Sequence, residues 1–116
     1  MDRQRLFKSF RYAVEGIRVC LHEQNFKIHI VAGVTAVILG IITGLSLVEW
    51  MIVCLVISLV IVAEMFNTAI EKVVDLASPE IHPLAKAAKD IAASAVLVIA
   101  CVSVIIGILI FIPKWI

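Results

Sequence analysis

Three long stretches of this chain carry almost no charge, and they restrict the folds that are open to it. Within residues 28–48 only His29 can carry a charge, and residues 50–63 and 91–112 contain no acidic or basic side chain. About twenty apolar residues in a helix span the roughly 30 Å hydrocarbon core of a bilayer. The chain is also 63% hydrophobic, which is too apolar for a soluble domain of this size. We therefore expect an all-α integral membrane protein.

Ahead of the first apolar stretch, the sequence predicts an amphipathic helix over residues 4–24. Its apolar side chains recur at spacings of three and four on one face, while basic side chains occupy another face. This pattern is typical of a helix that lies in the plane of the lipid headgroups. A helix packed against the rest of the protein gives the same pattern, and the two interpretations are compatible.

Three transmembrane helices are predicted over residues 27–48, 50–76 and 84–112, so that the whole chain, 1–116, forms one membrane domain. Glu49 and Trp50 are predicted to form a very short outer turn. The segment 78–83 contains two prolines, which remove backbone donors and end the second span. Basic residues gather near the N-terminus and on both sides of this segment, whereas the Glu49 turn has none. The positive-inside rule therefore places the N-terminus and the 78–83 loop on the cytoplasmic side of the plasma membrane.

Four polar residues interrupt the second predicted span: Glu64, Asn67, Glu71 and Asp75. Their spacings of three and four residues place them on one stripe of a helix. An ionisable side chain at membrane depth is costly and usually faces a protein interior or a polar cavity. At 1.5 Å per residue, Glu64 lies roughly 20 Å along the helix from Met51, and Glu71 roughly 30 Å. Glu64 is thus predicted below the cytoplasmic surface and Glu71 about at it.

Two other segments deliver polar side chains to the same inner-leaflet zone, namely Lys89 and Asp90 before the third span and Glu23 at the end of the first helix. Carboxylates there can bind Mg²⁺, which often reaches a protein through one or two carboxylates plus substrate phosphates. A deeper carboxylate beside an amide can take a proton from a lipid hydroxyl. Phosphoryl transfer needs mainly positioning and charge neutralisation, which a small helical scaffold can supply. The sequence has neither a P-loop nor a glycine-rich kinase loop.

The motif from Glu64 to Asp75, followed by Ala88-Lys89-Asp90 and Ser94-Ala-Val, resembles the prokaryotic diacylglycerol kinase family of small trimeric membrane kinases. The resemblance covers nearly the whole chain. Its E-x-x-N-[ST]-A-[IL]-E-x-x-x-D signature is specific, because so dense a polar pattern is rare in an apolar helix. The segments 9–17 and 25–29 are similar to the Gram-positive branch, whose members phosphorylate undecaprenol. The resemblance implies an ATP- and Mg²⁺-dependent lipid kinase acting on undecaprenol or, as the alternative, on diacylglycerol.

The resemblance also implies roles for individual residues. Glu64 is the expected catalytic base, Glu23 and Glu71 are the expected ligands of the metal that bridges ATP, and Asn67 is expected to orient the base or the substrate. The expected nucleotide contacts are Arg5, Tyr12, Glu23, Glu71, Glu80, Ile81, His82, Lys89 and Asp90, and the expected lipid contacts are Arg5, Glu64 and Asn67. Asp75 and Ser94 are expected to contact the site residues without touching the substrates themselves. His29 receives no role, because some family members carry an acidic residue at its position.

Family members are homotrimers with active sites shared between neighbouring subunits, and a trimer also fits the need to shield a polar stripe from lipid. No nucleic-acid partner is implied. Two other function classes remain open on the residues alone: a proton-coupled exporter that uses Glu64 as a carrier, and a membrane subunit whose polar stripe seals an assembly. An exporter needs a cavity near the midplane and one essential acid. A kinase needs several acids and a lysine at the cytoplasmic end, which is the pattern of this sequence.

Overall fold

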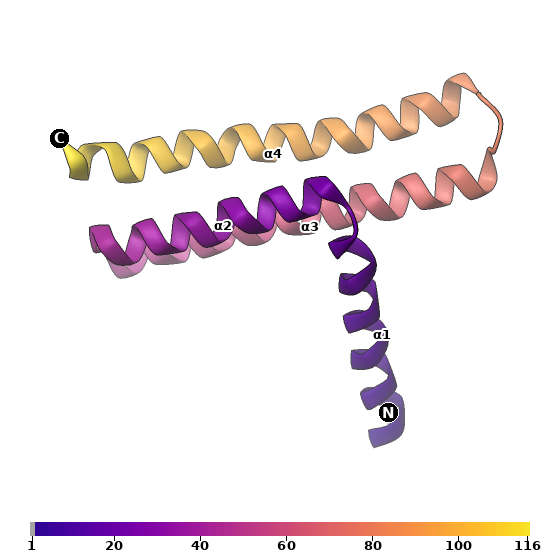
Figure 1. Ribbon diagram of the computed structural model, residues 1–116, viewed down its shortest axis with the longest axis horizontal. Coiled ribbons are helices and arrows are strands. Elements are labelled where there is room, and N and C mark those ends of the chain that lie inside the picture. The colour runs from indigo at the N-terminus through magenta and orange to yellow at the C-terminus, as the bar shows by residue number, and fades with distance from the viewer. Residues whose placement is uncertain (1) are drawn as a thin grey trace.

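The computed structural model describes residues 2–116, which form four α-helices joined by short turns. These helices are α1 (Arg3–Leu21), α2 (Gln24–Thr43), α3 (Leu47–Ala77) and α4 (Pro83–Trp115). α3 packs against both α2 and α4 with the three axes roughly aligned, and α1 leaves them at a steep angle (Figure 1). By length and hydropathy, α2, α3 and α4 can each cross a membrane. The predicted all-α fold with three apolar spans is therefore confirmed.

α1 meets the other helices only near its C-terminal end. It begins at an N-cap, where the Asp2 side chain accepts a hydrogen bond from the backbone N–H of Arg5 at 2.8 Å. Cys20 is its one buried residue, at the corner where α1 reaches α2 and α3. Phe7 and Phe10 are 70% and 67% exposed. Their placement against a membrane surface remains a prediction.

The turn between α2 and α3 lies earlier in the chain than the predicted turn at Glu49 and Trp50. α2 ends at Thr43, because Gly44 takes a φ of +80°, a conformation that favours glycine. Ser46 then starts α3 through a capping box: its side chain accepts from the backbone N–H of Glu49, and the Glu49 carboxylate accepts from the backbone N–H of Ser46. The end of the first span therefore moves from residue 48 to Thr43, and Glu49 and Trp50 belong to α3.

The turn between α3 and α4 agrees with the proline-containing segment. Pro83 occupies the start of α4, where its missing N–H costs nothing, and the His82 side chain accepts a hydrogen bond from the backbone N–H of Leu84 at 3.0 Å. α4 continues past the predicted end at residue 112, with Pro113 inside its last turn. Trp115 Nε1 donates to Thr43 Oγ1 at 2.9 Å, which connects the far ends of α4 and α2.

The buried apolar core is small and lies toward the end of the bundle that carries the C-terminus. Val53 of α3 packs there with Ile110 and Phe111 of α4. Large apolar side chains over much of the remaining chain are exposed. Such a surface suits a bilayer, because acyl chains solvate apolar side chains that water would exclude. The opposite end of the bundle has a different character, since it holds the polar stripe of α3.

Candidate active site

α3 carries all the polar side chains that are buried within residues 2–116. Glu64, Asn67 and Thr68 are 3%, 6% and 3% exposed. Further along the same helix Glu71 is half-buried and Asp75 is exposed. Burial within the protein thus decreases along the predicted stripe from Glu64 to Asp75. Sequence reasoning missed Thr68, although its spacing of four residues from Glu64 places it on the same side of α3.

His29 is the side chain of α2 that meets Glu64. Its Nε2 lies 3.6 Å from Glu64 Oε2, and the two side chains are 19% and 4% exposed. No function was expected for His29 from the sequence. Only the packing of α2 against α3 brings this imidazole to the carboxylate.

Asn67 connects the buried part of the stripe with Glu71. Its Nδ2 donates to Glu71 Oε1 at 3.4 Å, one helical turn away. Its Oδ1 is buried and has no hydrogen-bond partner. A buried acceptor without a partner costs about 1–3 kcal/mol, and a bound group that supplies the partner recovers that energy. Asn67 Oδ1 is therefore an acceptor available to a ligand between Glu64 and Glu71.

Cys20, at the corner between α1 and α2, lies close enough to the Glu64 carboxylate for that charge to act on its thiol. Burial raises the pKa of the Cys20 thiol, and the negative charges of Glu23 and Glu64 raise it further, while Lys72 acts in the opposite direction. Glu23 is the N-cap residue of α2 and makes no side-chain capping hydrogen bond. Its carboxylate is therefore not committed to the helix end.

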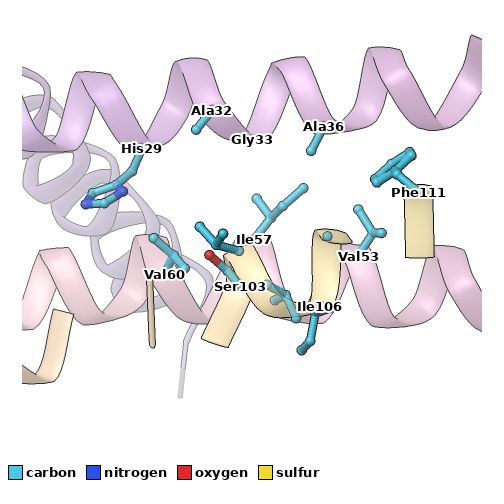
Figure 2. Close-up of a pocket in the computed structure, with 13 residues that line it drawn as sticks. His29, Ala32, Gly33, Ala36, Val53, Ile57, Val60, Ser103, Ile106 and Phe111 are labelled. Carbon is cyan, nitrogen blue, oxygen red and sulfur yellow. The ribbon is translucent and has the colours of Figure 1, made fainter. Parts of the chain in front are cut away.

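An apolar groove with a cavity volume of about 210 Å³ begins at His29 and runs between α2, α3 and α4 (Figure 2). Small residues line it on α2 and α4, among them Ala32, Gly33 and Gly107. Figure 2 shows the imidazole projecting from α2 toward α3, near Val60. The groove is thus mostly apolar, apart from Ser103, and has its basic group at the end nearest Glu64.

The family model for prokaryotic diacylglycerol kinases matches residues 11–111. The chain belongs to the prokaryotic diacylglycerol kinase family. The undecaprenol kinase of Bacillus subtilis is 50% identical over 97% of this chain and 93% of its own length. The diacylglycerol kinase of Synechocystis is 41% identical over 88% of this chain and 59% of its own length. The diacylglycerol kinase of Escherichia coli K12 is 32% identical over 87% and 84%.

Membership in the prokaryotic diacylglycerol kinase family confirms the prediction of a lipid kinase and of ATP as phosphoryl donor. It also decides between the three function classes that the residues left open, in favour of the enzyme. The chain is a multi-pass membrane protein, as its three apolar helices and its family require. The individual roles of the site residues remain predictions.

The kinase's predicted nucleotide residues fall into two groups in the structure. Lys89 forms an ion pair with Asp75 at the exposed end of the stripe, whereas Lys86 Nζ lies 2.6 Å from Asp90 Oδ2 within α4. Ser94 Oγ donates to the backbone carbonyl of Asp90 at 2.8 Å.

The second group lies on exposed elements. Arg5 and Tyr12 are exposed on α1, which leaves the bundle (Figure 1). Glu80, Ile81 and His82 are exposed in the turn between α3 and α4. Within residues 2–116, no hydrogen bond or ion pair joins these residues to the buried part of the stripe.

The donor set around Asn67 fits the Mg²⁺ that the kinase family implies. Within residues 2–116, no group of three His, Cys, Asp or Glu side chains is placed to hold a metal ion. Mg²⁺ does not require such a cage, because it keeps several waters and binds through one or two carboxylates plus substrate phosphates. Asn67 Oδ1 is an oxygen without a partner, and Asn67 Nδ2 orients the Glu71 carboxylate beside it. Oxygen donors of this kind suit a hard cation.

Proposed function

We propose that this kinase phosphorylates undecaprenol at the inner leaflet of the plasma membrane, with ATP as donor and Mg²⁺ as cofactor. The observation that carries the proposal is the burial of Glu64 and Asn67 on a helix long and apolar enough to cross a membrane. The 50% identity to an undecaprenol kinase supports the choice of lipid. Diacylglycerol is the alternative acceptor, which the relatives named diacylglycerol kinase favour.

Glu64 acts as the general base in this proposal. Its carboxylate takes the proton of the lipid's primary hydroxyl while the hydroxyl oxygen attacks the γ-phosphorus of ATP. A new oxygen–phosphorus bond forms, the bond from the γ-phosphorus to the bridging oxygen breaks, and ADP leaves with that oxygen. The burial of Glu64 keeps water from the reacting oxygen, which limits wasteful hydrolysis of ATP.

Asn67, Glu71 and Glu23 serve the phosphate side of the reaction. Asn67 contacts the bound lipid beside the base, with its buried Oδ1 free to accept, and Asn67 Nδ2 holds the Glu71 carboxylate in place. Glu71 and Glu23 are the residues that would hold Mg²⁺. When bound, this ion neutralises charge on the transferred phosphoryl group and the leaving group.

The residues that bind the nucleotide lie on parts of the fold that do not meet within a single chain. Lys89, Asp90 and the exposed turn at residues 80–82 contact ATP, and Arg5 and Tyr12 reach it from α1. Because α1 points away from its own bundle, we propose a homotrimer in which active sites are shared between neighbouring subunits (Figure 1). The N-terminus and these sites face the cytoplasm, as the distribution of basic residues predicts. Asp75 holds Lys89 through their ion pair, and Ser94 donates to the backbone carbonyl of Asp90.

The test is a side-by-side assay of the purified protein with undecaprenol and with diacylglycerol in mixed micelles containing Mg·ATP. Formation of each phosphorylated lipid is measured against lipid concentration. We expect kcat/KM for undecaprenol to exceed that for diacylglycerol by at least about tenfold, a difference of about 1.4 kcal/mol in transition-state binding. The reverse preference would make the protein a diacylglycerol kinase. No phosphorylation of either lipid would contradict both assignments.

A further inference from the structure

His29 faces the buried carboxylate of α3, although neither the family resemblance nor the proposed mechanism gives it a role. The 3.6 Å between His29 Nε2 and Glu64 Oε2 is an ion-pair distance, somewhat longer than a hydrogen bond. Catalytic hydrogen bonds are often long in unliganded enzymes and shorten when substrate binds.

Glu64 needs a partner of this kind because α3 alone does not fix its carboxylate. Among residues 2–116, His29 is the one basic side chain within 4.0 Å of Glu64. The nearby amide group of Asn67 donates to Glu71 instead. A general base must hold its accepting oxygen at the substrate hydroxyl, and a displacement of about 1 Å can lower the rate about 100-fold.

His29 also lines one end of the apolar groove, and its imidazole is the lining group that faces Glu64. The groove is lined beyond His29 by apolar side chains and small residues of three helices. Figure 2 shows the imidazole at one end of this lining, between α2 and α3. A hydroxyl that arrives at this end of the groove meets the imidazole and the Glu64 carboxylate together.

We propose that His29 is a positioning residue for Glu64, an inference that rests on the proposed role of Glu64 as base. His29 Nε2–H donates to Glu64 Oε2, which leaves Oε1 oriented to take the proton of the lipid hydroxyl. A neutral imidazole with its proton on Nε2 and a charged imidazolium both supply this donor. The proposal therefore depends on the geometry of the contact and not on the charge of His29.

Two substitutions separate this positioning role from a packing role. His29→Leu keeps apolar bulk and removes the donor, whereas His29→Gln keeps an N–H donor at similar reach. We expect His29→Leu to lower kcat about 10- to 100-fold with KM for lipid and ATP changed less than about threefold. We expect His29→Gln to restore most of kcat. Thr35→Val on the same helix is the matched control, because Thr35 is exposed and its hydroxyl donates only to the carbonyl of Val31.

The outcomes distinguish this inference from the function on which it rests. Wild-type kcat in His29→Leu, together with loss of activity in Glu64→Gln, would overturn the positioning role and leave the kinase mechanism intact. Equal losses in His29→Leu and His29→Gln would show that the donor is not what matters. A wild-type protein inactive on every lipid would contradict the proposed function itself.

A spectroscopic measurement tests the contact without any assay of turnover. In protein with ¹⁵N-labelled histidine, the His29 signals are assigned by their absence in His29→Gln. We expect Glu64→Gln to shift the His29 Nε2 resonance, because the charged acceptor facing it is removed, and Thr35→Val to leave it in place. An unchanged resonance in Glu64→Gln would rule out the contact.

Discussion

At the scale of the residue, burial separates four side chains that the sequence presents as one stripe. Glu64 and Asn67 are enclosed, Glu71 is half-buried, and Asp75 is exposed and paired with Lys89. A buried ionisable group costs several kcal/mol unless it is paired. The chain retains such a group at Glu64 with a single imidazole nearby, which favours a chemical role over a structural one.

Glu64→Gln is expected to abolish turnover while the protein remains folded. The amide has the size of the carboxylate but cannot accept the hydroxyl proton, and general-base catalysis contributes about 10²- to 10⁴-fold. The measurement is ATP-dependent phosphorylation of undecaprenol, with the assembly checked by size-exclusion chromatography. A variant that kept a near-normal rate would show that Glu64 is not the base.

Glu71→Gln is expected to raise the Mg²⁺ concentration needed for half-maximal rate, because a neutral amide binds a hard cation more weakly than a carboxylate. We expect a shift of about tenfold or more, measured by titrating Mg²⁺ at fixed ATP. Glu15→Gln is the matched control, because Glu15 is an exposed carboxylate that pairs with Arg18 on α1 rather than with the stripe. An unchanged titration in Glu71→Gln would count against metal binding by this residue.

At the scale of the element, periodicity and proline located the helices, and local hydrogen bonds set their ends. The apolar run through residue 48 hides the turn at Gly44, because a positive φ and a capping box leave little trace in hydropathy. Hydropathy likewise does not show that α4 continues to Trp115, with Pro113 inside its last turn. Hydropathy thus predicted the three spans but not the residues at which α2 and α4 end.

The α2–α3 hairpin depends on a close approach at Gly40. A Cβ added there would lie 2.8 Å from Trp50 Cη2 and 3.0 Å from Leu45 Cδ1, whereas one added at Gly107 would meet nothing within 4 Å. We expect Gly40→Ala to be less stable than Gly107→Ala by about 1–3 kcal/mol, the usual effect of overpacking. Thermal unfolding in detergent measures the difference. Because both variants gain the same helix propensity, equal unfolding temperatures would mean that the Gly40 contact is not tight.

At the scale of the whole molecule, a single chain does not bring all the residues of the proposed site together. α1 carries Arg5 and Tyr12 away from the bundle, and the apolar side chains of α1 are largely uncovered (Figure 1). The buried apolar core of the bundle is small and does not include the polar stripe. A second subunit that places its α1 over this stripe would supply the nucleotide residues and shield the carboxylates from lipid.

Shared active sites predict complementation between two inactive variants. Arg5→Ala disables the contribution of α1, and Glu64→Gln disables that of α3. When the two chains are co-expressed in equal amounts, about one quarter of the sites combine an intact α1 with an intact α3 from different subunits. We expect about a quarter of wild-type activity in the purified mixture. Activity no higher than that of either variant alone would contradict sharing between these two helices.

The sequence by itself determined the class of fold and the family, and it predicted the residues of the candidate site. Uncharged runs long enough to cross a bilayer favour helices, because lipid offers the backbone no hydrogen-bond partner. The dense polar motif of α3 indicated the family, which the family model then confirmed. Only the tertiary structure decided which polar groups are enclosed and what they meet. His29 reaches Glu64 across 35 residues of sequence, and Asn67 Oδ1 is left without a partner, because the packing of helices sets both.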